Sequence, residues 1–286
     1  MVALCLGLLL GMTAPGCARN PVTGRPEAVL TSEAAEIEYG NQVAELVQAE
    51  MGLVEDPELE PYLAALGQRL ALHSPRKNLT YTFQVVDLAE ANAFALPGGH
   101  VYVSRGLLSL VNSEDDLAAV LGHEIGHIAA RHSVRRQTAT APLAPLQIAA
   151  ALGGVAASIV SPNLGQMVAG IGQLPGAFVM AAYSREQERE ADRLGQEFAA
   201  AAGFDPMALS LLARTLAREE DLEGEGAAVR PFLLSHPPSP ERSAAAKTYA
   251  ENLVIATGLQ TPLDRKAFLA HADGIVLGQP AAEGVF

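Results

Sequence analysis

The sequence predicts an α+β fold that is mainly helical, with one small mixed β-sheet. Apolar residues recur at helical spacing in several long stretches, which is typical of amphipathic helices. Two short segments, 79–86 and 101–103, are instead rich in β-branched and aromatic residues, as strands are. With 286 residues, 49% of them hydrophobic, the chain can form one large or two small domains around a substantial core.

The first 16 residues contain a short leucine-rich run that precedes Cys17. A transmembrane helix needs about 20 apolar residues, so this run is too short to span a bilayer. Its layout resembles a bacterial lipoprotein signal peptide, which ends at a cysteine that receives lipid. The cleaved signal of a soluble secreted protein shares this layout and is the alternative. If Cys17 is acylated, no other thiol remains after Cys5 leaves, so disulfides contribute nothing.

The segment that follows, 17–30, is expected to be a lipidated tether, because residues 20–26 are rich in Pro and Gly. A single folded domain is then predicted over 31–253. It begins with helices at 31–51 and 61–72. In the first of these helices, the apolar side chains expected to face inward are Ile37, Val43, Leu46 and Val47.

Residues 79–86 alternate between apolar and polar side chains, and Pro97-Gly98-Gly99 is a turn signal that leads into 101–103. These segments predict the small sheet. The next helix is expected to begin after Ser113, a favourable N-cap residue that is followed by three carboxylates in the first turn. This helix would pack against the sheet.

The same helix carries the motif His123-Glu124-Ile125-Gly126-His127. Residues four apart on a helix project the same way, so the two imidazoles can bind one metal ion while Glu124 lies beside them. Zinc with neutral His ligands lowers the pKa of bound water to about 7. The pattern therefore predicts a zinc site with Glu124 as general base.

Tetrahedral zinc in a catalytic site needs a third protein ligand, and Glu188 is the candidate. It lies in a predicted helix that begins after Ser184, with Asp192 on the same face four residues later. Asp192 could hydrogen-bond a metal-binding imidazole, as carboxylates commonly do around metals. The neighbouring Glu186 and Glu190 are expected to be solvated.

Residues 137–184, between the two metal-binding helices, contain no Asp, Glu, Lys, Arg or His. Prolines and glycines interrupt this stretch, and its longest smooth run, 148–160, falls short of the about 20 residues that a membrane span requires. An Ala/Gly-rich helical hairpin or lid, near the active site or on the membrane, is the favoured interpretation. A transmembrane span is the alternative.

The C-terminal part is expected to contain a helix at 207–218, an acidic loop at 221–226 and a short helical pattern at 267–270. Residues 254–286 are predicted to be a tail or the beginning of a further region. The chain carries 19 basic and 32 acidic residues, a formal charge of −13. This balance argues against nucleic acid as a partner and against electrostatic binding to anionic lipid.

The motif at 123–127, followed by Ser184-Arg185-x-x-Glu188-x-x-Ala191-Asp192, resembles the gluzincin zinc metallopeptidases of family M48, including the HtpX-like and BepA-like members of bacterial lipoprotein type. Residues 92–103 and 235–242 resemble further segments of that family. The resemblance implies a zincin-like metalloprotease domain with an HExxH active-site helix and one Zn²⁺ per chain.

Position by position, the resemblance implies zinc ligands at His123, His127 and Glu188, with Glu124 and Asp192 as catalytic residues. Val101, Tyr102 and Val103 would form the edge strand with which an extended substrate pairs. In some relatives, a His matching His236 binds the zinc as an inhibitory fourth ligand; a plain loop residue is the alternative. Arg242 would orient substrate or pair with a carboxylate. The other histidines, His132 among them, are expected to be structural or exposed.

The expected function is zinc-dependent endoproteolysis of unfolded or misassembled envelope proteins by zinc-activated water. The partners would be protein or peptide substrates, and a lipid on Cys17 would attach the chain to the membrane, facing the periplasm of a bacterial cell envelope. The alternative is a periplasmic chaperone or assembly factor for outer-membrane proteins, whose zinc site is plugged and mostly inactive. The sequence leaves the oligomeric state open.

Overall fold

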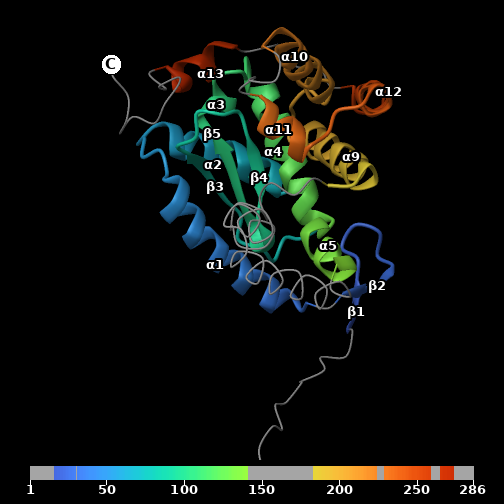
Figure 1. The fold of residues 1–286 in the computed structure, drawn as a ribbon. Helices are drawn as coiled ribbons and strands as arrows, with labels where there is room; N and C mark the ends of the chain where they lie inside the picture. Colours follow the sequence, from blue (N-terminus) through green and yellow to red (C-terminus); the bar gives the residue numbers. More distant parts are fainter. Residues whose placement is uncertain (1–15, 30, 141–182, 224–228, 259–264, 274–286) are drawn as a thin grey trace, which may run out of the picture.

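A computed structural model of the chain describes residues 16–29, 31–140, 183–223, 229–258 and 265–273 (Figure 1). Its strands are β1 (Gly16–Arg19), β2 (Pro26–Val29), β3 (Thr82–Val86), β4 (Ala93–Ala95) and β5 (His100–Ser104). Its helices are α1 (Glu33–Met51), α2 (Leu59–Ala71), η1 (Pro97–Gly99), α3 (Arg105–Leu108), α4 (Glu114–Ala129), α5 (His132–Thr140), α9 (Arg185–Ala201), α10 (Ala208–Glu223), α11 (Arg230–Ser235), α12 (Pro240–Thr257) and α13 (Arg265–Ala272). The predicted α+β class, mainly helical with a small mixed sheet, is confirmed.

The mixed sheet has the strand order β3-β5-β4, with β3 parallel and β4 antiparallel to β5. The prediction that Val101, Tyr102 and Val103 form an edge strand is therefore wrong, because β5 is the central strand. The second neighbour of β5 is β4, which the sequence does not reveal. Strand β4 has only three residues, too few to give a strand pattern, and the chain turns back through η1 before β5 pairs with it. Among the described residues, β4 pairs on one side only.

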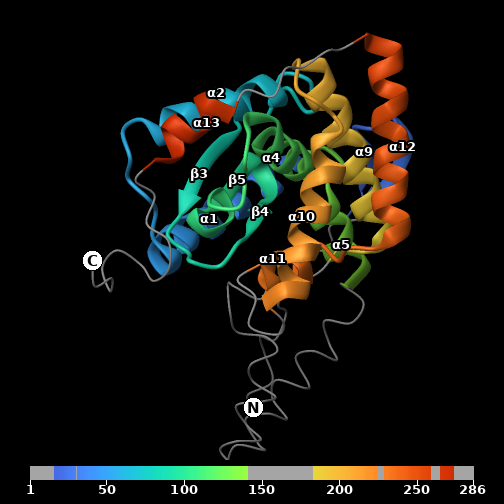
Figure 2. The same cartoon turned by 90° about the horizontal axis from the view of Figure 1, so that it is seen from above.

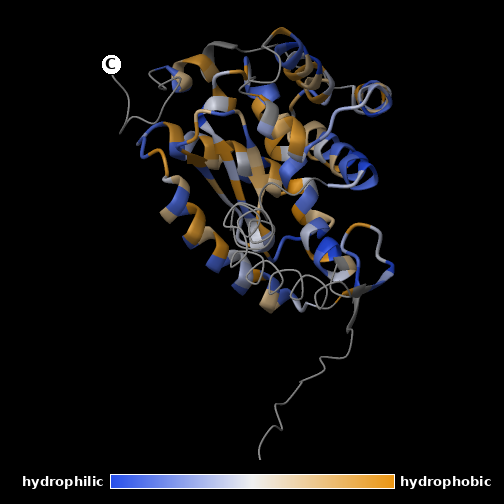
Figure 3. Cartoon of the chain, viewed as in Figure 1, coloured by the Kyte–Doolittle hydropathy of each residue, from blue (hydrophilic) through white to orange (hydrophobic). Residues whose placement is uncertain are grey.

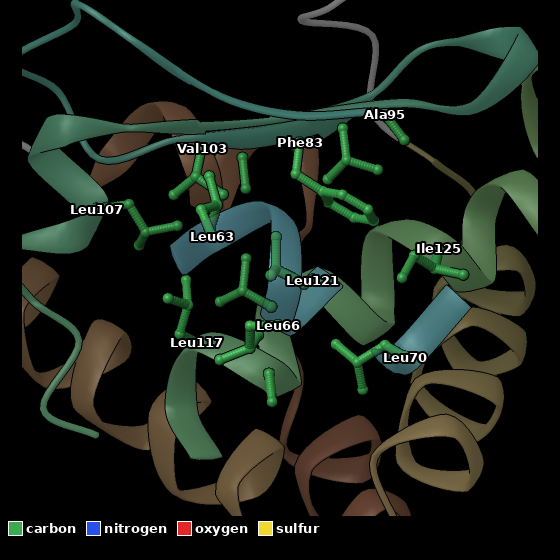
Figure 4. Close-up of a cluster of buried hydrophobic side chains, with 14 of the residues drawn as sticks. Leu63, Leu66, Leu70, Phe83, Ala95, Val103, Leu107, Leu117, Leu121 and Ile125 are labelled. Carbon is green, nitrogen blue, oxygen red and sulfur yellow. The ribbon is translucent and has the colours of Figure 1, made fainter. Parts of the chain in front are cut away.

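Helices α2 and α4 cover one face of this sheet and form the main core with it (Figure 4). Their leucines lie against Phe83 and Val103, and all of these side chains are at most 3% exposed. In Figure 3, hydrophobic colouring dominates the strands of the sheet and α4, whereas α9 is largely hydrophilic. The HExxH helix therefore packs against the sheet, as predicted, with its N-cap at Ser113.

Helix α1 covers the opposite face, where Val43 and Val47 pack on Tyr102. The prediction that Leu46 faces inward is wrong, since its side chain is 44% exposed. The buried stripe of α1 instead passes through Gly40, where a Cβ atom would lie 1.8 Å from the Pro97 carbonyl oxygen. This close approach fixes the rotation of the helix and turns Leu46 to the surface.

The expected tether forms a two-stranded hairpin in this structure, in which β1 and β2 pair from Gly16↔Val29 to Arg19↔Pro26. Asn20 organises the turn, because its side-chain oxygen accepts hydrogen bonds from the backbone N–H groups of Val22 and Thr23. Arg135 of α5 holds the hairpin through Glu27, with 2.8 Å between Nε and Oε1. Cys17 lies in β1, and its lipidation stays a prediction.

The C-terminal helices extend the domain beyond the predicted boundary at 253. Helix α12 packs on α9 and runs to Thr257 (Figure 2). Phe268 of α13 is 1% exposed within the main core. The core therefore includes part of the segment expected to be a tail.

Several expectations fall outside the described residues: the signal segment at 1–15, the uncharged stretch at 141–182 and the chain end at 274–286. Within the described part, no helix has the length and hydropathy of a membrane span.

Candidate metal centre

The candidate metal centre forms where α4 and α9 pack against each other at unusually short range. Glycines make this possible. A Cβ atom on Gly126 would lie 2.8 Å from the Ala191 carbonyl oxygen, and one on Gly195 would lie 2.7 Å from the backbone nitrogen of His123. Ser184 caps α9, as predicted, in a capping box with Gln187. The backbones that carry the predicted ligands are therefore held almost in contact.

His123, His127 and Glu188 converge between these helices, and all three are at most 2% exposed. The two Nε2 atoms lie 3.0 Å apart, and they lie 3.5 Å and 3.3 Å from the Glu188 carboxylate. Ligand atoms at 2.0–2.1 Å from a tetrahedral zinc ion are about 3.3 Å from one another. The observed separations match that spacing, so these donors could hold a metal ion.

His236 joins this group from the C-terminal end of α11. Its side chain is buried, and its Nδ1 atom lies 3.2 Å from His123 Nε2 and 3.1 Å from Glu188 Oε1. Ligand atoms from all four residues lie within 4.8 Å of one another. The structure thus places His236, buried, beside the other three potential ligands, and its binding to a metal stays a prediction.

The donor chemistry suits a cation. Burial lowers the pKa of His127 well below its ordinary value, which keeps its imidazole neutral and able to bind a metal. Burial alone would raise the pKa of Glu188, but His236 and His127 hold it well below the ordinary value. A carboxylate and imidazole nitrogens at these distances are ligands that zinc prefers.

Glu124 lies beside the donor set and is fully buried. Neither of its carboxylate oxygens has a hydrogen-bond partner among the described residues, and His236 Nε2 lies 3.4 Å from its Oε1. Burial raises the pKa of Glu124, against the opposing effect of His236 and His123. A buried carboxylate that accepts no hydrogen bond is costly, so this one is placed to accept a proton or a polar ligand.

Asp192 stands behind His123, with 2.9 Å between Oδ1 and Nδ1. Arg242 of α12 binds the same carboxylate through two nitrogens, at 2.5 Å and 2.7 Å, and reaches Glu188 Oε2 at 2.5 Å. Burial would raise the pKa of Asp192, but Arg242 and His123 hold it below the ordinary value. Of the two roles expected for Arg242, the structure shows pairing with carboxylates.

Two residues at the site were missed by sequence reasoning. His132 is 0% exposed, and its Nδ1 lies 2.8 Å from His127 Nδ1. Glu190 was expected to be solvated, but its Oε2 atom lies 3.1 Å from His132 Nε2. Helical spacing could not reveal this pair, because α4 ends at Ala129 and Arg131 adopts a positive φ of 54° that turns the chain back.

Comparison with known proteins agrees with this geometry. Residues 57–250 match the model of Peptidase family M48. The chain is 30% identical over 260 residues to the beta-barrel assembly-enhancing protease of Escherichia coli (strain K12), covering 88% of this chain and 52% of that protein. It is 33% identical over 182 residues to the mitochondrial metalloendopeptidase OMA1 of Schizosaccharomyces pombe, covering 63% and 50%. It is 29% identical over 218 residues to metalloprotease YcaL of E. coli K12, covering 76% of each chain.

The chain spans about half the length of the first of these relatives. The family match covers most of this chain and includes both α4 and α9 and the Arg242 region. The chain therefore belongs to peptidase family M48, a family of zinc metallopeptidases.

Proposed function

We propose that this protein is a zinc-dependent metalloendopeptidase whose ion is held by His123, His127 and Glu188. The observation that carries the proposal is the near-tetrahedral spacing of these three donors, at 3.0–3.5 Å from one another. Zinc held there would polarise a peptide carbonyl and lower the pKa of a water molecule. Measuring the metal content of purified protein, wild type against Glu188→Ala, tests the ligand set.

Glu124 is proposed as the general base. Its carboxylate is buried next to the ligands, and its raised pKa makes it a better proton acceptor than an exposed glutamate. It would take the proton of the attacking water and pass it to the leaving amine. Asp192 would act with it by fixing the tautomer and ring orientation of His123. Glu124→Gln should lower kcat by about 10²- to 10⁴-fold and leave zinc content unchanged. Loss of zinc from this variant would contradict the proposal that Glu124 is a base and not a zinc ligand.

His236 is proposed as an inhibitory fourth ligand. Its Nδ1 is at ligand spacing from His123 and Glu188, and a closed set of four protein ligands is typical of structural zinc sites rather than catalytic ones. His236→Ala should therefore raise proteolysis of casein. A proteolysis rate equal to or below that of wild type would contradict an inhibitory role for His236.

For substrate binding, we propose β4 in place of β5. The N–H and C=O groups of alternate residues point to the same side of a strand. The carbonyl of Asn92 and the N–H of Leu96 bond toward β5, so the backbone groups of Ala93 and Ala95 point away from it. An extended peptide could pair there without regard to its side chains. Both alanines are buried, so this pairing requires the site to open.

The proposed substrates are unfolded or misassembled proteins of a bacterial envelope, with the chain anchored through a lipid on Cys17. The name of the E. coli relative, a beta-barrel assembly-enhancing protease, supports this setting. Mass spectrometry of Cys17 in protein from the membrane fraction tests the anchor. An unmodified or absent Cys17 would contradict it.

The second candidate function is a chaperone or assembly factor that binds such proteins and rarely cleaves them. The buried His236 within the donor set favours it. Glu124→Gln separates the two functions. If an assembly phenotype survives in cells while cleavage of casein is lost, binding is the main activity; if both are lost, proteolysis is.

A further inference from the structure

Behind the metal centre, His127, His132 and Glu190 form a continuous chain of contacts. The Nδ1 atoms of the two histidines lie 2.8 Å apart, and His132 Nε2 lies 3.1 Å from Glu190 Oε2. His132 is fully buried at the beginning of α5. Its ring faces the back of a proposed zinc ligand on one side and a carboxylate on the other.

A metal bound at His127 Nε2 would set the positions of the protons in this chain. With Nε2 bound to the metal, the hydrogen of His127 would be on Nδ1. His132 must then accept that hydrogen bond with the lone pair of its own Nδ1, because two N–H groups cannot face each other at hydrogen-bond distance. The remaining proton of His132 is on Nε2, where it donates to Glu190.

Other contacts hold the outer end of this chain in place. Arg135 donates to the same Glu190 oxygen at 2.9 Å and also binds Glu27 of β2 at 2.8 Å. Gln187 of α9 donates to the backbone carbonyl of His132 at 3.3 Å. The carboxylate that orients His132 is thus tied to the N-terminal hairpin, and the backbone of His132 is tied to the second metal-binding helix.

We propose that His132 is a positioning residue: it holds His127 in the tautomer and orientation that bind the metal, and Glu190 in turn holds His132. The inference rests on the proposed metal site and extends it. Hydrogen-bond partners behind a metal-binding histidine commonly contribute 10- to 100-fold to metal affinity.

Two amide variants distinguish the contact that His132 makes through Nδ1 from the contact that it makes through Nε2. In His132→Asn, the side-chain oxygen lies near the former Nδ1 and can still accept from His127, but the side chain no longer reaches Glu190. In His132→Gln, the amide nitrogen lies near the former Nε2 and can still donate to Glu190, but the acceptor for His127 is lost. The zinc dissociation constant of the full chain, measured by competition with a chelating dye, is the readout. His73→Gln, at an exposed position, is the matched control.

We expect His132→Asn to bind zinc within about threefold of wild type and His132→Gln to bind about 10- to 100-fold more weakly. Equal affinities of these two variants, whether both like wild type or both reduced, would indicate a packing role and overturn the proposal. His123→Ala should lose zinc in either case; if it binds like wild type, the metal site itself is misassigned.

Glu190→Ala provides a second test if His132→Gln does not fold. The Glu190 side chain is 20% exposed, so its removal disturbs the core less than a change at buried His132. Without its acceptor, His132 can adopt the other tautomer and direct an N–H at His127. Zinc binding about tenfold weaker than wild type supports the proposal. An affinity equal to wild type refutes it.

Discussion

Gly126 lies between the two histidines of α4 and faces the backbone of α9. A methyl group at this position would lie 2.8 Å from the Ala191 carbonyl oxygen and 3.1 Å from its Cα atom. The first distance is 0.6 Å shorter than the 3.4 Å at which ordinary contact begins. Both contacts are with backbone atoms, which cannot rotate away as a side chain could. Gly126→Ala should therefore push α4 and α9 apart.

The expected magnitude combines two opposing effects. Alanine is about 1 kcal/mol more favourable than glycine in a helix interior. Overpacking of a well-filled core typically costs about 1–3 kcal/mol, and the rigid backbone on α9 favours the upper half of that range. We expect the free energy of unfolding of the zinc-free protein to fall by about 1–2 kcal/mol. Because Glu188 moves with α9, zinc affinity should fall by about tenfold or more.

Urea unfolding in the presence of a chelator measures the first quantity, and a zinc titration by dye competition measures the second. Ala244→Gly, at an exposed position in α12, is the control, because it reports the helix propensity difference without a clash. If Gly126→Ala were more stable than wild type and bound zinc equally well, the close approach of α4 and α9 would not be what positions the ligands.

Three other changes test how the surrounding structure supports the site. Ser184→Ala removes the capping box with Gln187 and should lower stability by about 1 kcal/mol, measured as the shift in the urea midpoint. Arg76→Met removes the partner that lies 2.6 Å from buried Glu36 and should cost about 3 kcal/mol; a loss below about 1 kcal/mol would mean that Arg131 compensates fully. Glu33 has its pKa lowered by a hydrogen bond from Arg76, so its contribution is present above the ordinary value of 4.5 and is lost as pH falls below it. The stability difference between wild type and Glu33→Gln, up to about 1 kcal/mol at pH 7 because the Glu33 side chain is exposed, should shrink in urea titrations as the pH falls below 4.5. A difference that stays constant with pH would contradict this sign.

The elements that the sequence predicted well are those with a strong local signal. Ser113 and Ser184 each cap the helix expected of them. The i,i+4 spacing of His123 and His127 correctly places both rings on one face. These features depend on residues a turn apart, so a single segment contains the information.

The failures concern contacts that no single segment contains. Strand β4 has three residues and shows its role only when paired with β5. His132 comes five residues after His127, which on a continuous helix would point it elsewhere, and only the turn at Arg131 brings its ring back. Leu46 has an ordinary inward pattern, but the approach of Gly40 to Pro97 rotates it outward.

The site also shows why the family motif alone does not determine ligand geometry. The motif places two imidazoles on α4, but the position of Glu188 depends on α9, and α9 is held on opposite sides by different elements. On one side the glycines of α4 set the distance between backbones. On the other, Arg242 of α12 binds Glu188 and Asp192 together, which fixes these two carboxylates relative to each other. Since Asp192 contacts His123 in turn, a disturbance of α12 should reach both α9 and α4 through one guanidinium group.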